Sequence, residues 1–140
     1  METITGHIIN CNIDPFTPNG WIVERHLKGG DVVWDPSKID LCLSKKQQKG
    51  DRIFVWDLRD YLSNKNVLNA NVLDYLLMDS RLIPEDWKGK SIMFWGTIYH
   101  YKGKRIRYLR WHDGEWRCEW RWVEEKHIFN HREPAAILKG

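Results

Sequence analysis

The side chains that most often carry catalysis or bind metals, namely histidine, cysteine and the carboxylates, are scattered in this sequence. His127 and His131 stand four residues apart, and two imidazoles at that spacing share one face of a helix and can bind zinc. His112 precedes Asp113, and a His–Asp pair can do acid–base work. Neither pair has a third ligand or a nucleophile at a matching spacing. The sequence therefore predicts surface and turn histidines, with no metal site, no catalytic residue and no cofactor.

Arginine and aromatic side chains alternate in the stretch 91–123, which holds most of the nine tryptophans of the chain. Such a combination can bind a partner, because a guanidinium pairs with anions and also stacks on aromatic rings. The pairs Lys102-Gly103 and Asp113-Gly114 divide the stretch into three β-rich runs, and Asp-Gly is typical of a two-residue hairpin turn. The sequence therefore predicts a three-stranded antiparallel meander.

The register of the meander follows if both turns are two-residue loops. Trp111 then lies opposite Trp116 in the second hairpin, and Phe94 lies opposite Trp111 in the first. Side chains alternate between the two faces of a sheet, so this register separates an apolar face from a polar one. We expect the apolar face to pack beneath the central helix, and it carries Ile92, Phe94, Gly96, Ile98, Leu109, Trp111, Trp116, Cys118 and Trp120. Gly96 leaves a gap in this face into which an aromatic ring or a helix can pack closely.

The opposite face of the meander, named here the aromatic–basic face, is the candidate binding surface. Its candidate binding residues are Trp95, Tyr99, Tyr108, Arg110, Arg117 and Arg121. Tyrosine, tryptophan and arginine dominate the energetics of interfaces, which favours a binding role. Alternatively, the N-terminal strands or the C-terminal tail cover this face, and its arginines pair with local carboxylates such as Glu115 and Glu119.

The strands that precede the meander are predicted from hydrophobic alternation. Ile39, Leu41 and Leu43 alternate with polar residues, which indicates a strand. The segment 9–13 alternates in the same way and predicts an edge strand, whereas 21–27 fits either a strand or a short helix. We therefore expect N-terminal strands before the middle of the chain.

The middle of the chain is predicted to be helical. In residues 52–62 the apolar side chains recur at three- and four-residue spacing, which predicts a short amphipathic helix. Asn71 is the expected N-cap of a second helix, and Pro84 begins a short helical turn, whereas 44–50 is polar, basic and expected to be exposed. The fold class is therefore α+β, with N-terminal strands, central short helices and a C-terminal three-stranded antiparallel meander.

The composition indicates a single globular domain over residues 1–140. Charge is mixed and the net value of +3 is mild, so it permits an acidic partner without identifying one. Three cysteines are too few and too scattered for a disulfide framework. The sequence has no signal-peptide pattern and no apolar run long enough for a bilayer, so we expect a cytoplasmic protein that does not enter the membrane.

Several short motifs resemble those of a known group of proteins. Trp95-Gly96-Thr97-Ile98-Tyr99 is followed by Tyr108-Leu109-Arg110-Trp111, and then by Gly114 and Trp116. This pattern is similar to that of a family of small uncharacterised bacterial proteins, and segments 20–24, 34–38, 67–77 and 82–90 belong to the same pattern. The resemblance implies a bacterial intracellular origin and a compact stand-alone domain. It implies no activity, cofactor or catalytic residue.

Three functions are compatible with these residues. The first is a non-enzymatic protein-interaction module, in which the aromatic–basic face meets an unidentified protein or a second copy of the chain. The alternative is single-stranded nucleic-acid binding, with bases stacked on the aromatic rings of that face and phosphates on its arginines. The last is a small hydrolase that uses His100, His112 or His127. The sequence offers no set of acid, base and nucleophile, so it favours a binding protein over an enzyme.

Overall fold

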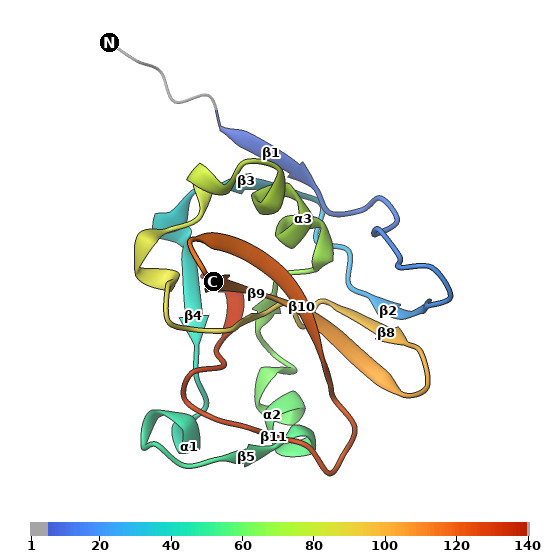
Figure 1. Ribbon diagram of the computed structural model, residues 1–140, viewed down its shortest axis with the longest axis vertical. Helices are drawn as coiled ribbons and strands as arrows, with labels where there is room; N and C mark the ends of the chain where they lie inside the picture. Colours follow the sequence, from blue (N-terminus) through green and yellow to red (C-terminus); the bar gives the residue numbers. More distant parts are fainter. Residues whose placement is uncertain (1–5, 140) are drawn as a thin grey trace.

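A large mixed sheet organises the fold, and the computed structural model describes the chain over residues 6–139 (Figure 1). Its strands follow the order β2-β8-β9-β7-β12-β4, while β10 pairs with β9 and β6 pairs with β12. The strand bounds are Ile22–His26 (β2), Ile39–Cys42 (β4), Asn66–Val67 (β6), Ile92–Met93 (β7), Thr97–His100 (β8), Lys104–His112 (β9), Glu115–Trp122 (β10) and Ala135–Leu138 (β12). Strands β8, β9 and β10 form an antiparallel meander, so the predicted α+β class is confirmed.

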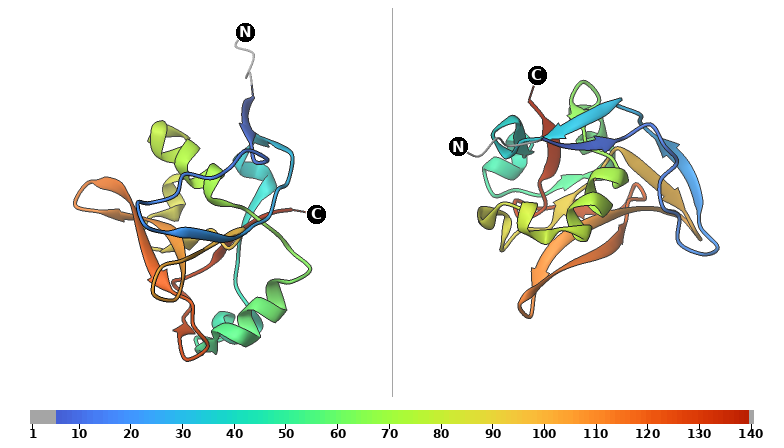
Figure 2. Two further views of the ribbon diagram at one scale, coloured as in Figure 1. Left: turned by 90° about the vertical axis from the view of Figure 1, so that its right-hand side faces the viewer. Right: turned by 90° about the horizontal axis from the view of Figure 1, so that it is seen from above.

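Helices and two small sheets lie at opposite ends of the molecule, with the large sheet between them (Figures 1 and 2). One end has α3 with the β1–β3 pair, and the other has α1 and α2 with the β5–β11 pair. The bounds are His7–Asn10 (β1), Asp31–Trp34 (β3), Lys45–Gln48 (α1), Ile53–Phe54 (β5), Val55–Leu62 (α2), Ala70–Met78 (α3) and Ile128–Phe129 (β11), and short 3₁₀ helices span Pro36–Lys38, Ser80–Leu82 and Glu85–Trp87. Within residues 6–139, no helix has the length and apolar character needed to cross a membrane.

Residues 92–95 contribute to two separate hydrophobic cores. Ile92 and Phe94 pack in the core beneath α3, whereas Met93 and Trp95 pack in the core beside α2. Successive side chains of an extended segment point to opposite sides, so this short stretch serves both cores. Both faces of the sheet are therefore buried at this point.

The second hairpin of the meander has the predicted register, and the first does not. Trp111 pairs with Trp116 as expected, but His100 pairs with Lys104, so the first loop has three residues, 101–103. Lys102 adopts a positive φ of 57° beside Gly103, a conformation that side-chain type alone does not indicate.

The chain also turns at residues 94–96, between β7 and β8, and this turn interrupts the alternation of side chains. The predicted pairing of Phe94 with Trp111 is therefore wrong. Ile98 was expected beneath α3, yet it packs with Trp95 in the core beside α2.

The N-terminus of α3 is fixed by a close approach of β8. The N-cap of this helix is Asn69, not the predicted Asn71, and its Oδ1 accepts a hydrogen bond from the Asn71 N–H at 3.0 Å. Asn69 Nδ2 donates to the carbonyls of Cys11 at 3.1 Å and Leu27 at 3.0 Å. A Cβ added to Gly96 would lie 2.7 Å from Asn69 Cα, so the predicted gap at this glycine is filled by the start of the helix.

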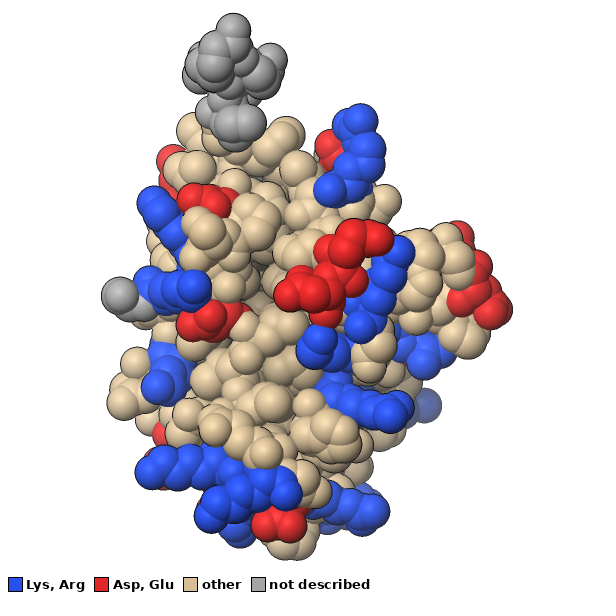
Figure 3. Space-filling model, turned by 90° about the vertical axis from the view of Figure 1, so that its left-hand side faces the viewer, with Lys and Arg blue, Asp and Glu red and all other residues tan. Residues whose placement is uncertain are grey.

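The segment 44–50, predicted to be polar and exposed, contains α1. Ser44 and Gln47 form a capping box, and the buried Gln47 side chain donates a hydrogen bond to the Asn130 carbonyl at 2.7 Å. The lysines of α1 remain exposed, and basic side chains gather at this end of the molecule in the face that Figure 3 shows. Elsewhere on that face acidic and basic groups are neighbours (Figure 3).

Replacing Gly96 tests whether the contact with Asn69 holds the fold together. We expect Gly96→Ala to lower the free energy of unfolding by roughly 1–3 kcal/mol, because the new methyl group overlaps backbone that cannot move aside. The measurement is urea denaturation followed by tryptophan fluorescence. The matched control is Gly29→Ala, since nothing lies within 4 Å of an added Cβ there. Equal stability of the two variants would contradict the contact's importance.

Candidate functional site

The aromatic rings of the aromatic–basic face are largely inaccessible. The exposed fraction of Trp95 is 3% and that of Tyr99 is 0%, so neither ring can stack on a partner from solvent. Tyr108 is half-buried, and its hydroxyl donates a hydrogen bond to Glu119 Oε1 at 3.0 Å. The structure therefore does not bring the six candidate residues together on one exposed surface.

The three arginines of this face are paired with carboxylates of the same chain. Arg110 Nε lies 3.0 Å from Glu119 Oε1, and Arg117 Nε lies 3.2 Å from Glu115 Oε2, although neither N–H is aligned to donate a hydrogen bond. Arg121 forms an ion pair with Glu133, donates to the Ile128 carbonyl at 2.8 Å and stacks on the Phe129 ring at 3.9 Å. These contacts agree with the second interpretation of the sequence, in which local carboxylates neutralise the arginines.

Two of the five tryptophans in the stretch 91–123 pack against one arginine of the protein itself. The Arg105 guanidinium lies 3.7 Å from the centre of the Trp120 ring and 3.9 Å from that of Trp122, with Trp21 and Tyr101 slightly farther away. Its Nε donates to the Tyr101 carbonyl at 2.9 Å. Trp120, expected in the apolar core, is instead 40% exposed on the outside of this cluster. The aromatic cluster therefore stabilises the fold and is already occupied.

A buried ion pair joins the sheet to α3. Arg107 Nη1 donates to Asp74 Oδ2 at 3.0 Å, and Nη2 donates to Asp74 Oδ1 at 2.7 Å. Burial by itself would lower the pKa of Arg107, but the hydrogen bonds and charge of Asp74 outweigh it and raise that pKa. This arginine is structural, because its charge is fully engaged within the chain.

The histidines do not converge. The segment 124–132 is not helical, and the His127 ring interacts with the backbone of Glu124, whereas His131 is exposed. His112 lies 3.2 Å from Asp113 at the tip of the second hairpin. In the described part of the chain, no group of three or more histidine, cysteine or acidic residues is placed to hold a metal ion.

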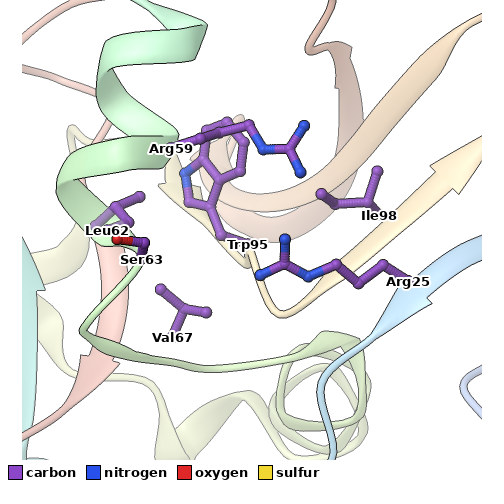
Figure 4. Close-up of a pocket in the computed structure, with 7 residues that line it drawn as sticks. All are labelled: Arg25, Arg59, Leu62, Ser63, Val67, Trp95 and Ile98. Carbon is purple, nitrogen blue, oxygen red and sulfur yellow. The ribbon is translucent and has the colours of Figure 1, made fainter.

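A small pocket between α2, β2 and β8 contains two arginines that, unlike those of β10, have no carboxylate beside them. Arg59 projects into it from α2 and Arg25 projects from β2, and the two guanidinium groups lie between Trp95 and Ile98 in the view of Figure 4. Leu62, Ser63 and Val67 complete the lining, and the volume is about 100 Å³. We name this cavity the arginine pocket. Its lining contains two cations and no acidic side chain.

The charges of the arginine pocket are not neutralised by the protein. Within residues 6–139, neither Arg25 nor Arg59 forms an ion pair or a side-chain hydrogen bond with a carboxylate. Burial and then the nearby charge of Arg25 lower the pKa of Arg59, an effect that Glu24 only partly offsets. The buried Trp95 Nε1–H also lacks an acceptor, and Figure 4 places that nitrogen on the side of Leu62 and Ser63. An anion in this pocket would relieve the repulsion between the two guanidinium groups.

Comparison with known proteins adds no family assignment. No family model, no curated protein and no solved structure matches the chain. The resemblance to small bacterial proteins therefore stays a prediction, and the case for a site depends on geometry alone.

Among the residues that line the arginine pocket, sequence reasoning named only Trp95 as a binding residue, and it placed Trp95 on a different surface. Arg25 and Arg59 belong to separate elements that are far apart in the chain, and neither lies in a recognisable motif. Only the packing of α2 beside β2 brings them together. No local signal in the sequence could have paired them.

The role assigned to Arg105 can be tested by a conservative substitution. We expect Arg105→Lys to lower the free energy of unfolding by about 1–2 kcal/mol, because lysine lacks the planar group that stacks between two indoles. Arg110→Lys is the matched control on the same strand, and its partly exposed ion pair should cost less than about 1 kcal/mol. Urea denaturation measures both. A larger loss for Arg110→Lys would show that the aromatic cluster is not structural.

Proposed function

We propose that this protein is a non-enzymatic binding domain that takes an anionic group of its partner into the arginine pocket. The observation that carries the proposal is the unneutralised pair Arg25 and Arg59 beside the unpartnered indole N–H of Trp95. Guanidinium groups present forked N–H donors that match the oxygens of phosphate and carboxylate. The sequence-based idea of a binding module is thus kept, and its contact surface moves from the aromatic–basic face to this pocket.

Phosphate is the anion that suits this pocket best. Two guanidinium groups and an indole N–H offer more donors than the two oxygens of a carboxylate can accept in one geometry. A phosphate group has at least three free oxygens and a larger negative charge. The volume of about 100 Å³ is also sufficient for one such group.

The lining supports binding and not turnover. It contains no histidine, cysteine or acidic residue, and the Ser63 hydroxyl already donates to the Asp60 carbonyl at 2.7 Å. General acid–base or nucleophilic catalysis needs a titratable group within reach of the ligand. Nucleic-acid binding through Trp95 and Tyr99 is not favoured, because both rings are buried.

Binding of inorganic phosphate tests the proposal directly. We expect phosphate at low ionic strength to raise the melting temperature and to give a saturable heat in titration calorimetry. Arg25→Gln and Arg59→Gln should each weaken binding by roughly 10- to 100-fold, since a hydrogen bond to a charged group contributes about 1.5–3 kcal/mol. Trp95→Phe, which keeps the ring and removes the N–H, should weaken it by a smaller factor.

The control for these variants is Arg110→Gln, which removes an arginine that already has a carboxylate partner. We expect it to bind phosphate as the unaltered protein does. Without phosphate, Arg59→Gln should be at least as stable as the unaltered protein, because it removes a repulsion between like charges. Equal loss of binding in Arg110→Gln and Arg59→Gln would mean that net charge alone attracts the anion, and the proposal would fail.

A further inference from the structure

Strand β10 forms one edge of the large sheet. It pairs with β9 along its whole length, Glu115–Trp122, and within residues 6–139 no strand pairs with its other side. None of its eight residues is buried, although the strand carries three tryptophans. The β9–β10 hairpin also projects from the body of the molecule in both views of Figure 2. A second strand can therefore approach this edge.

The β10 edge lacks the features that keep sheet edges from pairing. Natural proteins protect such edges with short strands, bulges, prolines or charged side chains. The two ends of the strand order follow this rule, because β4 has only four residues and β2 has a register shift between Val23 and Arg25. Strand β10 is longer, pairs with β9 without a shift and contains no proline, and its charges alternate in sign. Such an edge is suited to pairing with another strand.

The free backbone groups of this edge belong to Trp116, Cys118 and Trp120. The Val123 N–H donates to the Lys104 carbonyl at 2.9 Å, so the odd-numbered residues of β10 point their backbone groups toward β9. Those of the even-numbered residues point away from it. Within residues 6–139, no hydrogen bond outside the β9–β10 ladder uses the backbone groups of these three residues.

We propose that β10 pairs antiparallel with β10 of a second copy of this chain, so that two large sheets join across a two-fold axis. With the axis at Cys118, the free groups of Trp116 meet those of the second copy's Trp120, and those of Cys118 meet their own equivalents. The indole rings of the facing tryptophans lie on one side of the joined sheet and cover part of Trp120, which is 40% exposed in the single chain. The arginine pocket takes no part in this contact.

The charges along β10 select this register. Glu115, Arg117, Glu119 and Arg121 alternate in sign on one face of the strand. With the axis at Cys118, Arg117 lies opposite the second copy's Glu119, and Glu115 lies opposite its Arg121. Each facing pair is therefore attractive. Moving the axis to Arg117 or to Glu119 would place arginine opposite arginine and glutamate opposite glutamate.

A second copy also improves the surroundings of Arg117. Within one chain Arg117 lies opposite Arg110 of β9, and like charges in this position lower stability. Its Nε lies 3.2 Å from Glu115 Oε2 without the alignment of a hydrogen bond. In the dimer, the second copy's Glu119 adds a carboxylate on the open side of Arg117. This self-complementarity is the reason to assign the edge to a second copy and not to an unrelated protein.

Analytical ultracentrifugation over a range of protein concentrations tests the inference. We expect a reversible monomer–dimer equilibrium with a micromolar dissociation constant, because a single strand edge buries little area. Arg117→Glu and Glu119→Arg should each raise that constant at least about 10-fold, since each places like charges opposite each other on both sides of the axis. An equimolar mixture of the two variants should dimerise, because opposite charges then face each other again.

Two further variants separate this contact from general effects of charge and folding. Lys49→Glu makes the same change in net charge at an exposed lysine beside α1, and it should dimerise as the unaltered protein does. Cys118→Pro removes an N–H that points away from β9, so we expect it to abolish the dimer and to leave the monomer folded. Tryptophan fluorescence and the melting temperature report the folding of each variant.

Three results would overturn the inference. The first is a protein that stays monomeric at every accessible concentration. The second is a dimer that persists in Arg117→Glu, Glu119→Arg and Cys118→Pro, because the contact would then lie elsewhere. The third is a mixture of the two folded charge variants that remains monomeric, because the facing pairs of Arg117 and Glu119 would then not exist.

Discussion

The close approach of Gly96 to Asn69 is the contact on which the rest of the structure depends. Asn69 caps α3 and, through its side-chain amide, holds the carbonyls of Cys11 and Leu27. Gly96 donates its N–H to the Leu68 carbonyl and accepts from the Leu27 N–H at 2.7 Å. One contact therefore fixes a helix, the strand β8 and the loop after β2 relative to one another.

The double use of residues 92–95 explains why Trp95 of the aromatic–basic face is buried. When alternate side chains of a strand pack into two cores, both faces of the sheet are covered at that point. Polar groups that are buried there need hydrogen-bond or ion-pair partners inside the protein. The arginines of β9 and β10 have such partners. Arg107 bonds Asp74, Arg121 bonds Glu133, and Arg105 is enclosed by aromatic rings. A sheet covered on both sides leaves its edges and the adjoining loops as the places where a ligand can reach the protein.

Sequence reasoning predicted the parts of the fold that local signals specify. Asp113-Gly114 determines the second hairpin because its turn type requires positive φ, and that register was correct. The register predicted for the first hairpin was wrong because its loop has three residues and Lys102 adopts positive φ there. A lysine does not indicate such a conformation in a sequence. Strand β12 lies inside the large sheet, yet Ala135–Leu138 is short and lacks the alternation that marks a strand. The arginine pocket was beyond prediction, since two arginines from separate elements meet there only through tertiary packing.

The cost of keeping Arg25 of β2 and Arg59 of α2 together is what distinguishes them from the arginines of β9 and β10. A protein selected for stability alone would place a carboxylate beside them, as it does for Arg110 and Arg117. Burial and then the charge of Arg25 lower the pKa of Arg59, and the buried N–H of Trp95 nearby has no acceptor. Destabilising arrangements of this kind concentrate at functional sites. A ligand that supplies the missing partner removes the destabilisation, and the free energy gained in this way strengthens its binding. The electrostatic strain of the pocket is therefore the physical basis of the binding role that we propose for it.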